Sequence, residues 1–139
     1  SRLLLRPQPR QRLRLPRSLT VTPRVRIYPG HQFKILGISM SPEDLIHKYP
    51  ERIPVNVEVS EGLYLDRTKY LVPRTMTVGE FSIVIRKRMN KLKPYEAIFL
   101  FVNRSILPPT SSTFDTLHHE YSENNMLLHL KYTKENTFG

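Results

Sequence analysis

The sequence contains no cysteine, which excludes disulfide bonds, thiolate nucleophiles and zinc sites built on cysteine. It also lacks any apolar run near the roughly 18–20 residues that cross a bilayer, so membrane association would need a surface or an attached lipid. Neither a glycine-rich phosphate loop nor a nucleophile elbow is present. We therefore predict a protein that is not an enzyme and that carries no cofactor.

Acidic side chains are missing from residues 1–26, whose eight arginines supply most of the net charge of +10. The rest of the chain is nearly balanced, so the basic character describes the N-terminus rather than the whole protein. Five prolines within residues 1–30 prevent a regular helix there. We expect residues 1–30 to be a disordered basic extension. Residues 31–139 would form the folded domain, with a flexible tail over residues 133–139.

The extension has more than one interpretation. It could be a solvated, low-complexity segment without a role of its own. An arginine- and leucine-rich N-terminus without acids also resembles an organelle transit peptide. It could equally bind acidic lipid, nucleic acid or an acidic protein surface by charge alone. Aromatic residues are not interleaved with the arginines, which disfavours nucleic acid as a partner.

The most informative stretch runs from Lys69 to Met89 and predicts a strand followed by a helix. Tyr70 to Val72 are strand formers, and Pro73 either ends that strand or marks a sheet edge. Thr77 stands three residues before Glu80, which is the spacing of a capping box. The apolar residues that follow recur at helical spacing and form one face. An edge strand beside an apolar helix face would make a groove that could bind a peptide.

The remaining segments complete the pattern. Ser41 and Pro42 begin a helix that stops near Tyr49. The segment from Phe33 to Ile38 could form another helix, although Gly37 disfavours it. The other predicted elements are a half-buried strand over 53–59, a central strand buried on both faces over 97–102, a short helix over 113–121 and a last strand over 126–132.

The order strand–strand–helix–strand–short helix–strand is typical of an α+β fold, the ubiquitin-like β-grasp. In that fold the first and last of these strands lie parallel at the centre of the sheet. We therefore predict a ubiquitin-like β-grasp with N-terminal helices and the disordered basic extension.

Four motifs carry a resemblance to a known family. Residues 48–55 read KYPERIPV, 106–110 read ILPPT and 135–139 read ENTFG, and the stretch over 69–89 lies between the first two. In this order the motifs resemble the autophagy ubiquitin-like modifiers, the family of microtubule light chain three and the GABA-receptor-associated protein. The resemblance covers roughly residues 45–139 and leaves out the basic N-terminus.

This resemblance implies a chemical role for Gly139. Family members are activated at the terminal carboxylate, passed to the cysteines of an activating and a conjugating enzyme, and joined to phosphatidylethanolamine. A cysteine protease processes and deconjugates them. Glycine has no Cβ, so a thin tail can enter narrow active sites and its acyl carbon stays open to attack. The expected protein is a monomer, located in the cytoplasm and, when lipidated, on the autophagosome membrane.

The resemblance also implies a groove that binds cargo receptors through acidic aromatic-x-x-aliphatic motifs. The peptide adds a strand to an exposed sheet edge, and two pockets read its side chains. The first pocket would consist of Leu45, Pro54, Lys69, Leu71 and Leu127. The second would consist of Tyr70, Val72, Pro73, Met76, Phe81 and Val84. The contacts to the acidic residues of the motif would be Arg52, Lys69 and Arg88. Leu127 replaces a usual aromatic and Ser41 a common acid, which bears on receptor specificity.

Alternatives stay open for several of these residues. Phe81 and Val84 fit ordinary core as well as they fit a pocket, because an apolar helix face must pack somewhere. An unconjugated peptide-binding adaptor, or a basic organelle protein that binds nucleic acid, would share much of this pattern. Metal binding is not expected, because adjacent histidines on a helix point different ways. The residues considered for metal or acid–base roles and set aside are His118, His119, His129, Asp115, Glu120 and Glu123.

Overall fold

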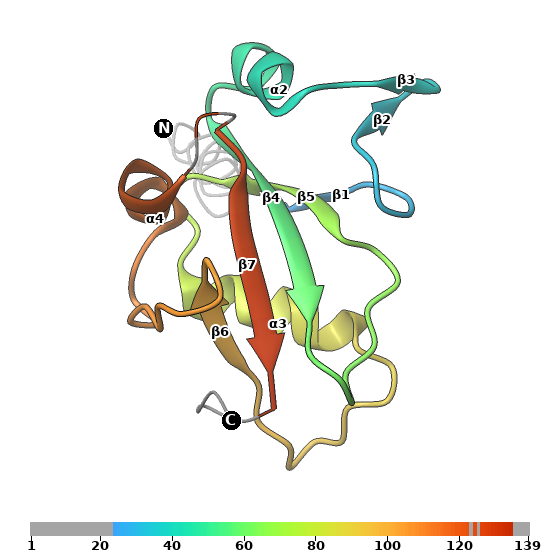
Figure 1. The fold of residues 1–139 in the computed structure, drawn as a ribbon, viewed down its shortest axis with the longest axis vertical. Coiled ribbons are helices and arrows are strands. Elements are labelled where there is room, and N and C mark those ends of the chain that lie inside the picture. Colours follow the sequence, from blue (N-terminus) through green and yellow to red (C-terminus); the bar gives the residue numbers. More distant parts are fainter. Residues whose placement is uncertain (1–23, 123, 125, 135–139) are drawn as a thin grey trace, which may run out of the picture.

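The computed structural model describes residues 24–122, 124 and 126–134. One sheet contains β1 (Arg26–Ile27), β4 (Arg52–Val59), β5 (Lys69–Pro73), β6 (Phe99–Val102) and β7 (Leu128–Thr133). The helices are α2 (Pro42–Lys48), α3 (Val78–Arg88) and α4 (Phe114–Tyr121), and a small hairpin consists of β2 (Lys34–Ile35) and β3 (Ile38–Ser39). Figure 1 shows these elements on the ribbon.

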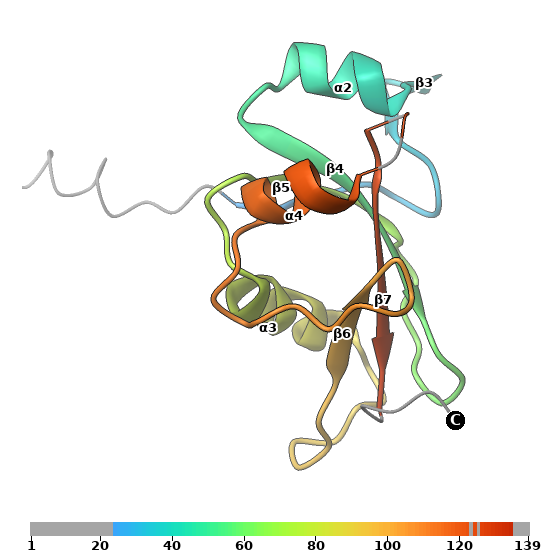
Figure 2. The same cartoon turned by 60° about the vertical axis from the view of Figure 1, so that its left-hand side comes forward.

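The five-stranded sheet has the order β1-β5-β4-β7-β6. Its centre is the parallel pair of β4 and β7, in which Val55 lies opposite Leu128. The strands β5 and β6 flank this pair in antiparallel pairings. Figure 2 shows α3 and α4 on the same side of the central strands, with α2 at one end. The predicted α+β ubiquitin-like β-grasp is confirmed.

Alternation along β5 divides the buried side chains between two clusters. Tyr70 and Val72 belong to the main core, together with buried residues of α3 and α4. Leu71 points to the opposite face, because successive strand residues alternate. It packs there with Leu45 of α2 in a second, smaller cluster. The strand β5 is therefore buried on both faces, although it has only five residues.

The helix α3 begins as the sequence predicted. The Thr77 hydroxyl accepts the amide of Glu80 at 3.2 Å, and the Glu80 carboxylate accepts the amide of Thr77 at 2.9 Å. Both bonds of the capping box are therefore present. The helix α2 also begins at its predicted N-cap, where the Ser41 hydroxyl accepts the amide of Asp44 at 3.1 Å.

We expect Thr77→Ala to lower the free energy of unfolding by about 1 kcal/mol, because the amide of Glu80 loses its acceptor. Urea unfolding followed by circular dichroism would measure the change. The matched control is Thr75→Ala, which makes the same chemical change at an exposed position before the helix. An equal loss in both variants would contradict the role of the cap.

Three predictions about the chain path are wrong. The segment predicted as a possible helix from Phe33 to Ile38 is the β2–β3 hairpin, because Leu36 and Gly37 have positive φ values of 53° and 81°. Consecutive positive φ values suit a two-residue hairpin turn and exclude a right-handed helix. Residues 24–30, assigned to the extension, instead contain β1, which pairs with β5.

The third correction concerns the apolar run over residues 97–102. It was predicted as a central strand, but β6 pairs only with β7 in the described part of the sheet and lies at its edge. Its burial has a local cause. The chain turns back after the strand, so that Val102 and Ile106 exchange two backbone hydrogen bonds of 2.7 and 3.0 Å. This return covers part of the outer edge of β6.

Candidate peptide-binding groove

The residues predicted for the first pocket gather on the α2 side of β5. Leu45, Leu71 and Leu127 belong to one buried cluster. Pro54 lies opposite Leu71 in the β4–β5 ladder and is buried. Lys69 is half-buried at the start of the strand. The structure thus brings the apolar part of this set together between a helix and the sheet.

Four of the residues predicted for the second pocket lie on the opposite, α3 side of β5. Tyr70, Val72, Met76 and Phe81 are buried members of the main core. Pro73 is also buried at the end of β5, and Val84 is half-buried on α3. The second pocket is therefore continuous with the hydrophobic core rather than separate from it.

The edge of β5 between the two pockets is occupied by β1. Arg26 lies opposite Leu71 and Ile27 opposite Tyr70 in an antiparallel ladder. The Tyr28 amide then donates to the Lys69 carbonyl at 3.0 Å. The prediction that β5 is an exposed edge strand is therefore wrong. The physical reason is that a segment far away in the sequence supplies the missing partner strand.

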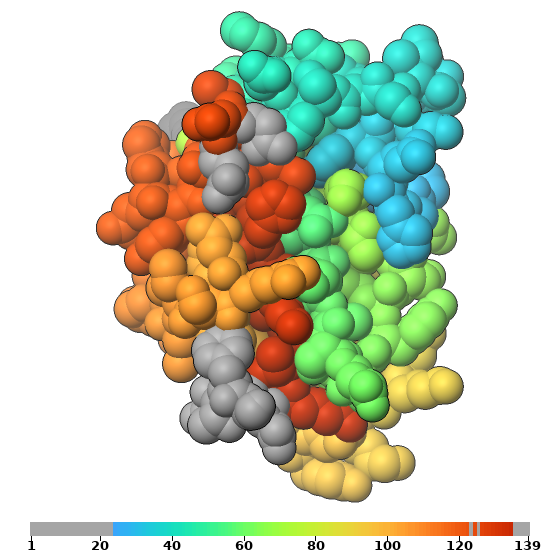
Figure 3. All heavy atoms as spheres, in the orientation of Figure 1, coloured from blue at the N-terminus to red at the C-terminus, as the bar shows by residue number. Residues whose placement is uncertain are grey.

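The first pocket is also filled from within the chain. Tyr28 and Phe33 are only 2% and 5% exposed and belong to the same cluster as Leu45, Leu71 and Leu127. Their rings meet edge to face, with 5.1 Å between centroids. In Figure 3 the blue and cyan residues of this N-terminal part lie against the green residues of β4 and β5.

The three cations predicted to attract acidic residues lie in different surroundings. The Arg52 guanidinium donates to the carbonyl of Arg24 and, at 3.4 Å, to that of Leu71. The Lys69 ammonium donates to the Asn56 side chain, and burial lowers its pKa. Arg88 is half-buried, and its Nε has no hydrogen-bond partner among the described residues. Arg52 and Lys69 thus lie beside β5, and Arg52 contacts the N-terminal segment directly.

A further cation, which the sequence did not single out, lies beside the first pocket. The guanidinium of Arg26 lies over the rings of Tyr28 and Tyr49, at 5.4 and 5.5 Å from their centroids. It also donates to the Tyr49 hydroxyl at 3.1 Å. These contacts attach β1 to the end of α2.

An open cavity lies next to this site. It has a volume of about 330 Å³ at the end of β5 and is lined by Glu51, Arg52, Pro73, Arg74 and Thr75. Arg74 is fixed there by its ion pair with Asp115 at 2.8 Å and by donating to the Pro50 carbonyl at 2.7 Å. The open space therefore borders two residues of the predicted groove, Arg52 and Pro73.

Sequence reasoning missed the residues that fill the groove. Val25 and Ile27 alternate with Arg26 between two prolines, Pro23 and Pro29. Such alternation of β-branched and polar residues is typical of a strand bounded by chain breakers. That pattern could have indicated β1, but the density of arginine and proline around it favoured an extension without structure.

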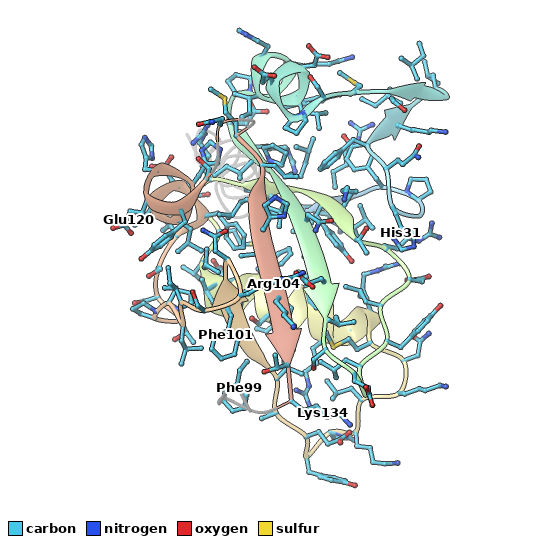
Figure 4. All side chains as sticks on the ribbon, viewed as in Figure 1. His31, Phe99, Phe101, Arg104, Glu120 and Lys134 are labelled. Atoms are coloured by element: carbon cyan, nitrogen blue, oxygen red, sulfur yellow. The ribbon has the colours of Figure 1, made fainter. Side chains whose placement is uncertain are left out.

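The histidines set aside as metal ligands make local contacts. His118 donates to the Met126 carbonyl at 2.9 Å, and His119 donates to the Asp115 carbonyl at 2.9 Å. Within residues 24–122, 124 and 126–134, no group of three or more candidate ligands could hold a metal ion. Figure 4 shows His31 at one edge of the sheet, with Phe99 and Phe101 toward the other. Gly139 lies outside the described residues.

Among residues 24–122, 124 and 126–134, no helix is both long enough and apolar enough to cross a membrane.

The parallel β4–β7 centre, the helix α3 across one face and the two clusters on either side of β5 define a ubiquitin-like β-grasp protein. The family model described as "Autophagy protein Atg8 ubiquitin like" matches residues 39–139. The chain belongs to this family of autophagy ubiquitin-like modifiers, and the resemblance inferred from its motifs is confirmed. The strand β1 and the hairpin strand β2 precede the matched residues.

Individual relatives agree with this assignment. The chain is 48% identical over 95 residues to Autophagy-related protein 8d of Arabidopsis thaliana, covering 66% of this chain and 78% of the relative. It is 47% identical to Autophagy-related protein 8 of Schizosaccharomyces pombe over 95 residues, covering 66% and 77%. The crystal structure of Trypanosoma brucei ATG8 is similar with a TM-score of 0.62 and 33% identity, covering 70% of this chain and 85% of that one.

Proposed function

We propose that this protein is an autophagy modifier that is conjugated through Gly139 to phosphatidylethanolamine and recruits cargo receptors through the groove at β5. The observation that carries the proposal is the family match, which extends over residues 39–139 and so includes Gly139. The proposed partners are an activating enzyme, a conjugating enzyme, a deconjugating cysteine protease and the receptors. The proposed locations are the cytoplasm and, after conjugation, the autophagosome membrane.

The conjugation step needs little from the folded domain. The lipid amine attacks the thioester carbonyl of Gly139, an amide forms, and the thiol of the conjugating enzyme leaves. Glycine suits this role because no Cβ hinders the attack. The last described strand, β7, ends at Thr133 and is separated from β5 by β4 in the sheet.

The groove geometry supports recognition of an aromatic and an aliphatic residue three positions apart. Residues three apart on a strand point to opposite faces. The two predicted pockets lie on opposite faces of β5, one against α2 and one against α3. Arg52 and Lys69 lie beside the same strand and could attract the acidic residues of such a motif.

We expect Gly139→Ala to reduce the phosphatidylethanolamine adduct at least tenfold, because the added methyl crowds the acyl carbon. The chain, tagged at its N-terminus, would be recovered from nutrient-starved cells and its C-terminal peptide weighed by mass spectrometry. The control variant Asn124→Ala alters an exposed position and should keep the adduct. A free carboxylate in the unaltered chain would contradict conjugation and favour the unconjugated adaptor.

A further inference from the structure

We propose that residues 24–33, called here the strap, are an internal ligand of the groove, which a receptor peptide must displace before it binds. The inference rests on the proposed peptide-binding function and adds a regulation of that site. The strap contains β1, and it ends at Phe33 just before β2. Its backbone, its side chains and its charge each support the proposal.

The strap uses the backbone groups that an added peptide strand would need. Its ladder covers Leu71 and Tyr70 of β5. The pairing continues beyond β1, since the Tyr28 amide donates to the Lys69 carbonyl at 3.0 Å and the Thr68 amide donates to the Gly30 carbonyl at 3.2 Å. A strand edge can pair with only one neighbour on that side. Strap and receptor peptide are therefore mutually exclusive.

The side chains of the strap occupy both faces of β5. Val25 and Ile27 pack, partly buried, against the main core on the α3 side. Tyr28 enters the cluster of the first pocket on the α2 side. Read backward from Tyr28, the strap presents an aromatic residue, two residues and an aliphatic Val25. Val25 and Tyr28 thus have the separation of the proposed motif, with the aliphatic and aromatic residues in the reverse order along the chain.

The strap is held by contacts that can be broken. The strand β1 has only two residues, so few ladder bonds oppose its release. The Tyr28 hydroxyl is buried and has no hydrogen-bond partner in the part of the chain that the structure describes. An unsatisfied buried hydroxyl costs free energy in the closed state. The short ladder and the unsatisfied hydroxyl thus oppose the stabilisation that burial of Tyr28 and Phe33 gives to the closed state.

Charge also favours an acidic competitor. The strap places Arg24 and Arg26 in the same region as Arg52 and Lys69, so cations of the strap lie near cations of the groove. An acidic peptide would replace this like-charged arrangement with an attractive one. An acidic peptide should therefore displace the strap less effectively as the salt concentration rises.

The expected effect follows from the fraction of molecules in which the groove is open. If the strap is closed in 90–99% of molecules, the apparent dissociation constant rises about tenfold to a hundredfold over the intrinsic one. Destabilising the strap should remove this factor without changing the groove. The family match begins at residue 39, so the strap precedes the matched residues while the groove lies within them. The strap would therefore weaken the apparent affinity of a groove that the matched residues form.

The experiment compares the full chain with the double variant Ile27→Ser/Tyr28→Ser. The probe is a fluorescein-labelled peptide of four glutamates followed by Trp-Ala-Ala-Leu, and its binding is followed by fluorescence anisotropy. We expect the double variant to bind the probe about tenfold to a hundredfold more tightly. The matched control is Leu36→Ser, which removes an apolar side chain that is 96% exposed on the hairpin, and it should bind like the unaltered chain.

A second measurement needs no variant. Hydrogen–deuterium exchange of residues 24–33 in the unaltered chain would be compared with and without saturating probe. We expect the protected Tyr28 amide to exchange faster when the probe is bound. Unchanged protection with the probe bound would overturn the proposal, whether or not the double variant folds.

The outcomes separate this inference from the proposed function. Equal affinity of the unaltered chain and the folded double variant would overturn the strap as an internal ligand and leave the groove function standing. Absence of probe binding to both would overturn the strap proposal together with the groove. Tighter probe binding to the double variant, together with faster hydrogen exchange of the Tyr28 amide when the probe is bound, would support both the strap proposal and the groove function.

Discussion

Phe81→Ala is expected to lower the free energy of unfolding by about 3–5 kcal/mol, the largest stability loss that we predict for this chain. Phe81 is fully buried on α3. Its ring meets that of Tyr70 edge to face at 5.8 Å between centroids and that of Phe114 at 5.0 Å. The side chain therefore joins β5, α3 and α4, and no single element could move to fill the cavity that its removal leaves.

Urea unfolding of the purified chain would measure this loss. The matched control is Ile83→Ala on the same helix, at a position that is 58% exposed, where we expect a change within about 0.5 kcal/mol. Similar losses in the two variants would contradict the assignment of Phe81 to the core. A large loss would also show that effects of Phe81 variants on peptide binding cannot be separated from folding.

The second large effect is a loss of stability in alkali through Tyr70. Burial raises the pKa of the Tyr70 hydroxyl to about 12, and this hydroxyl donates to the Arg67 carbonyl at 2.6 Å. In the unfolded chain the pKa is about 10. Between these values the unfolded state loses the proton while the folded state keeps it, so stability falls as the pH rises.

The stabilising contribution of Tyr70 to the free energy of unfolding is fully present below pH 10 and is lost by about pH 12. At 1.36 kcal/mol per pKa unit, the loss amounts to about 2–3 kcal/mol. Burial also raises the pKa of Tyr132 and, in the strap, that of Tyr28, so the whole protein should lose more than this. Urea unfolding at pH 7, 10 and 11 would follow the trend.

Tyr70→Phe isolates the effect, because phenylalanine has no proton to lose. Its stability should be lower at pH 7 by about 1 kcal/mol for the missing hydrogen bond, but it should decline less steeply above pH 10. The control Tyr64→Phe alters a side chain that is 52% exposed and should keep the steep decline. Parallel curves for Tyr70→Phe and the unaltered chain would contradict the prediction.

The helices could be predicted from the sequence because their signals are local. The capping box of α3 and the Ser41 N-cap of α2 depend on residues only three positions apart. The parallel pairing of β4 with β7 joins residues about 70 positions apart in the chain, and no local pattern specifies it. It could be predicted only from the order of the elements and the resemblance of the whole chain.

The groove shows the same division. The resemblance predicted which residues would line a groove at β5, and the structure brings three of them, Leu45, Leu71 and Leu127, together. It could not identify what occupies the site, because β1 precedes the residues that the family matches. A two-residue strand has almost no stability of its own, so its pairing depends entirely on the surface it meets. That surface forms only when the rest of the chain has folded.

The coverage of the sheet edges has a consequence for self-association. At one edge the return of the chain after β6 covers part of the strand, and at the other β1 covers β5. An uncovered strand edge is a template on which a second copy of the chain can add its own strand, which is how aggregates begin. If β1 leaves and no peptide takes its place, β5 becomes such a template. The segment that occupies the groove therefore also protects the molecule from polymerising with its own copies where many of them crowd together.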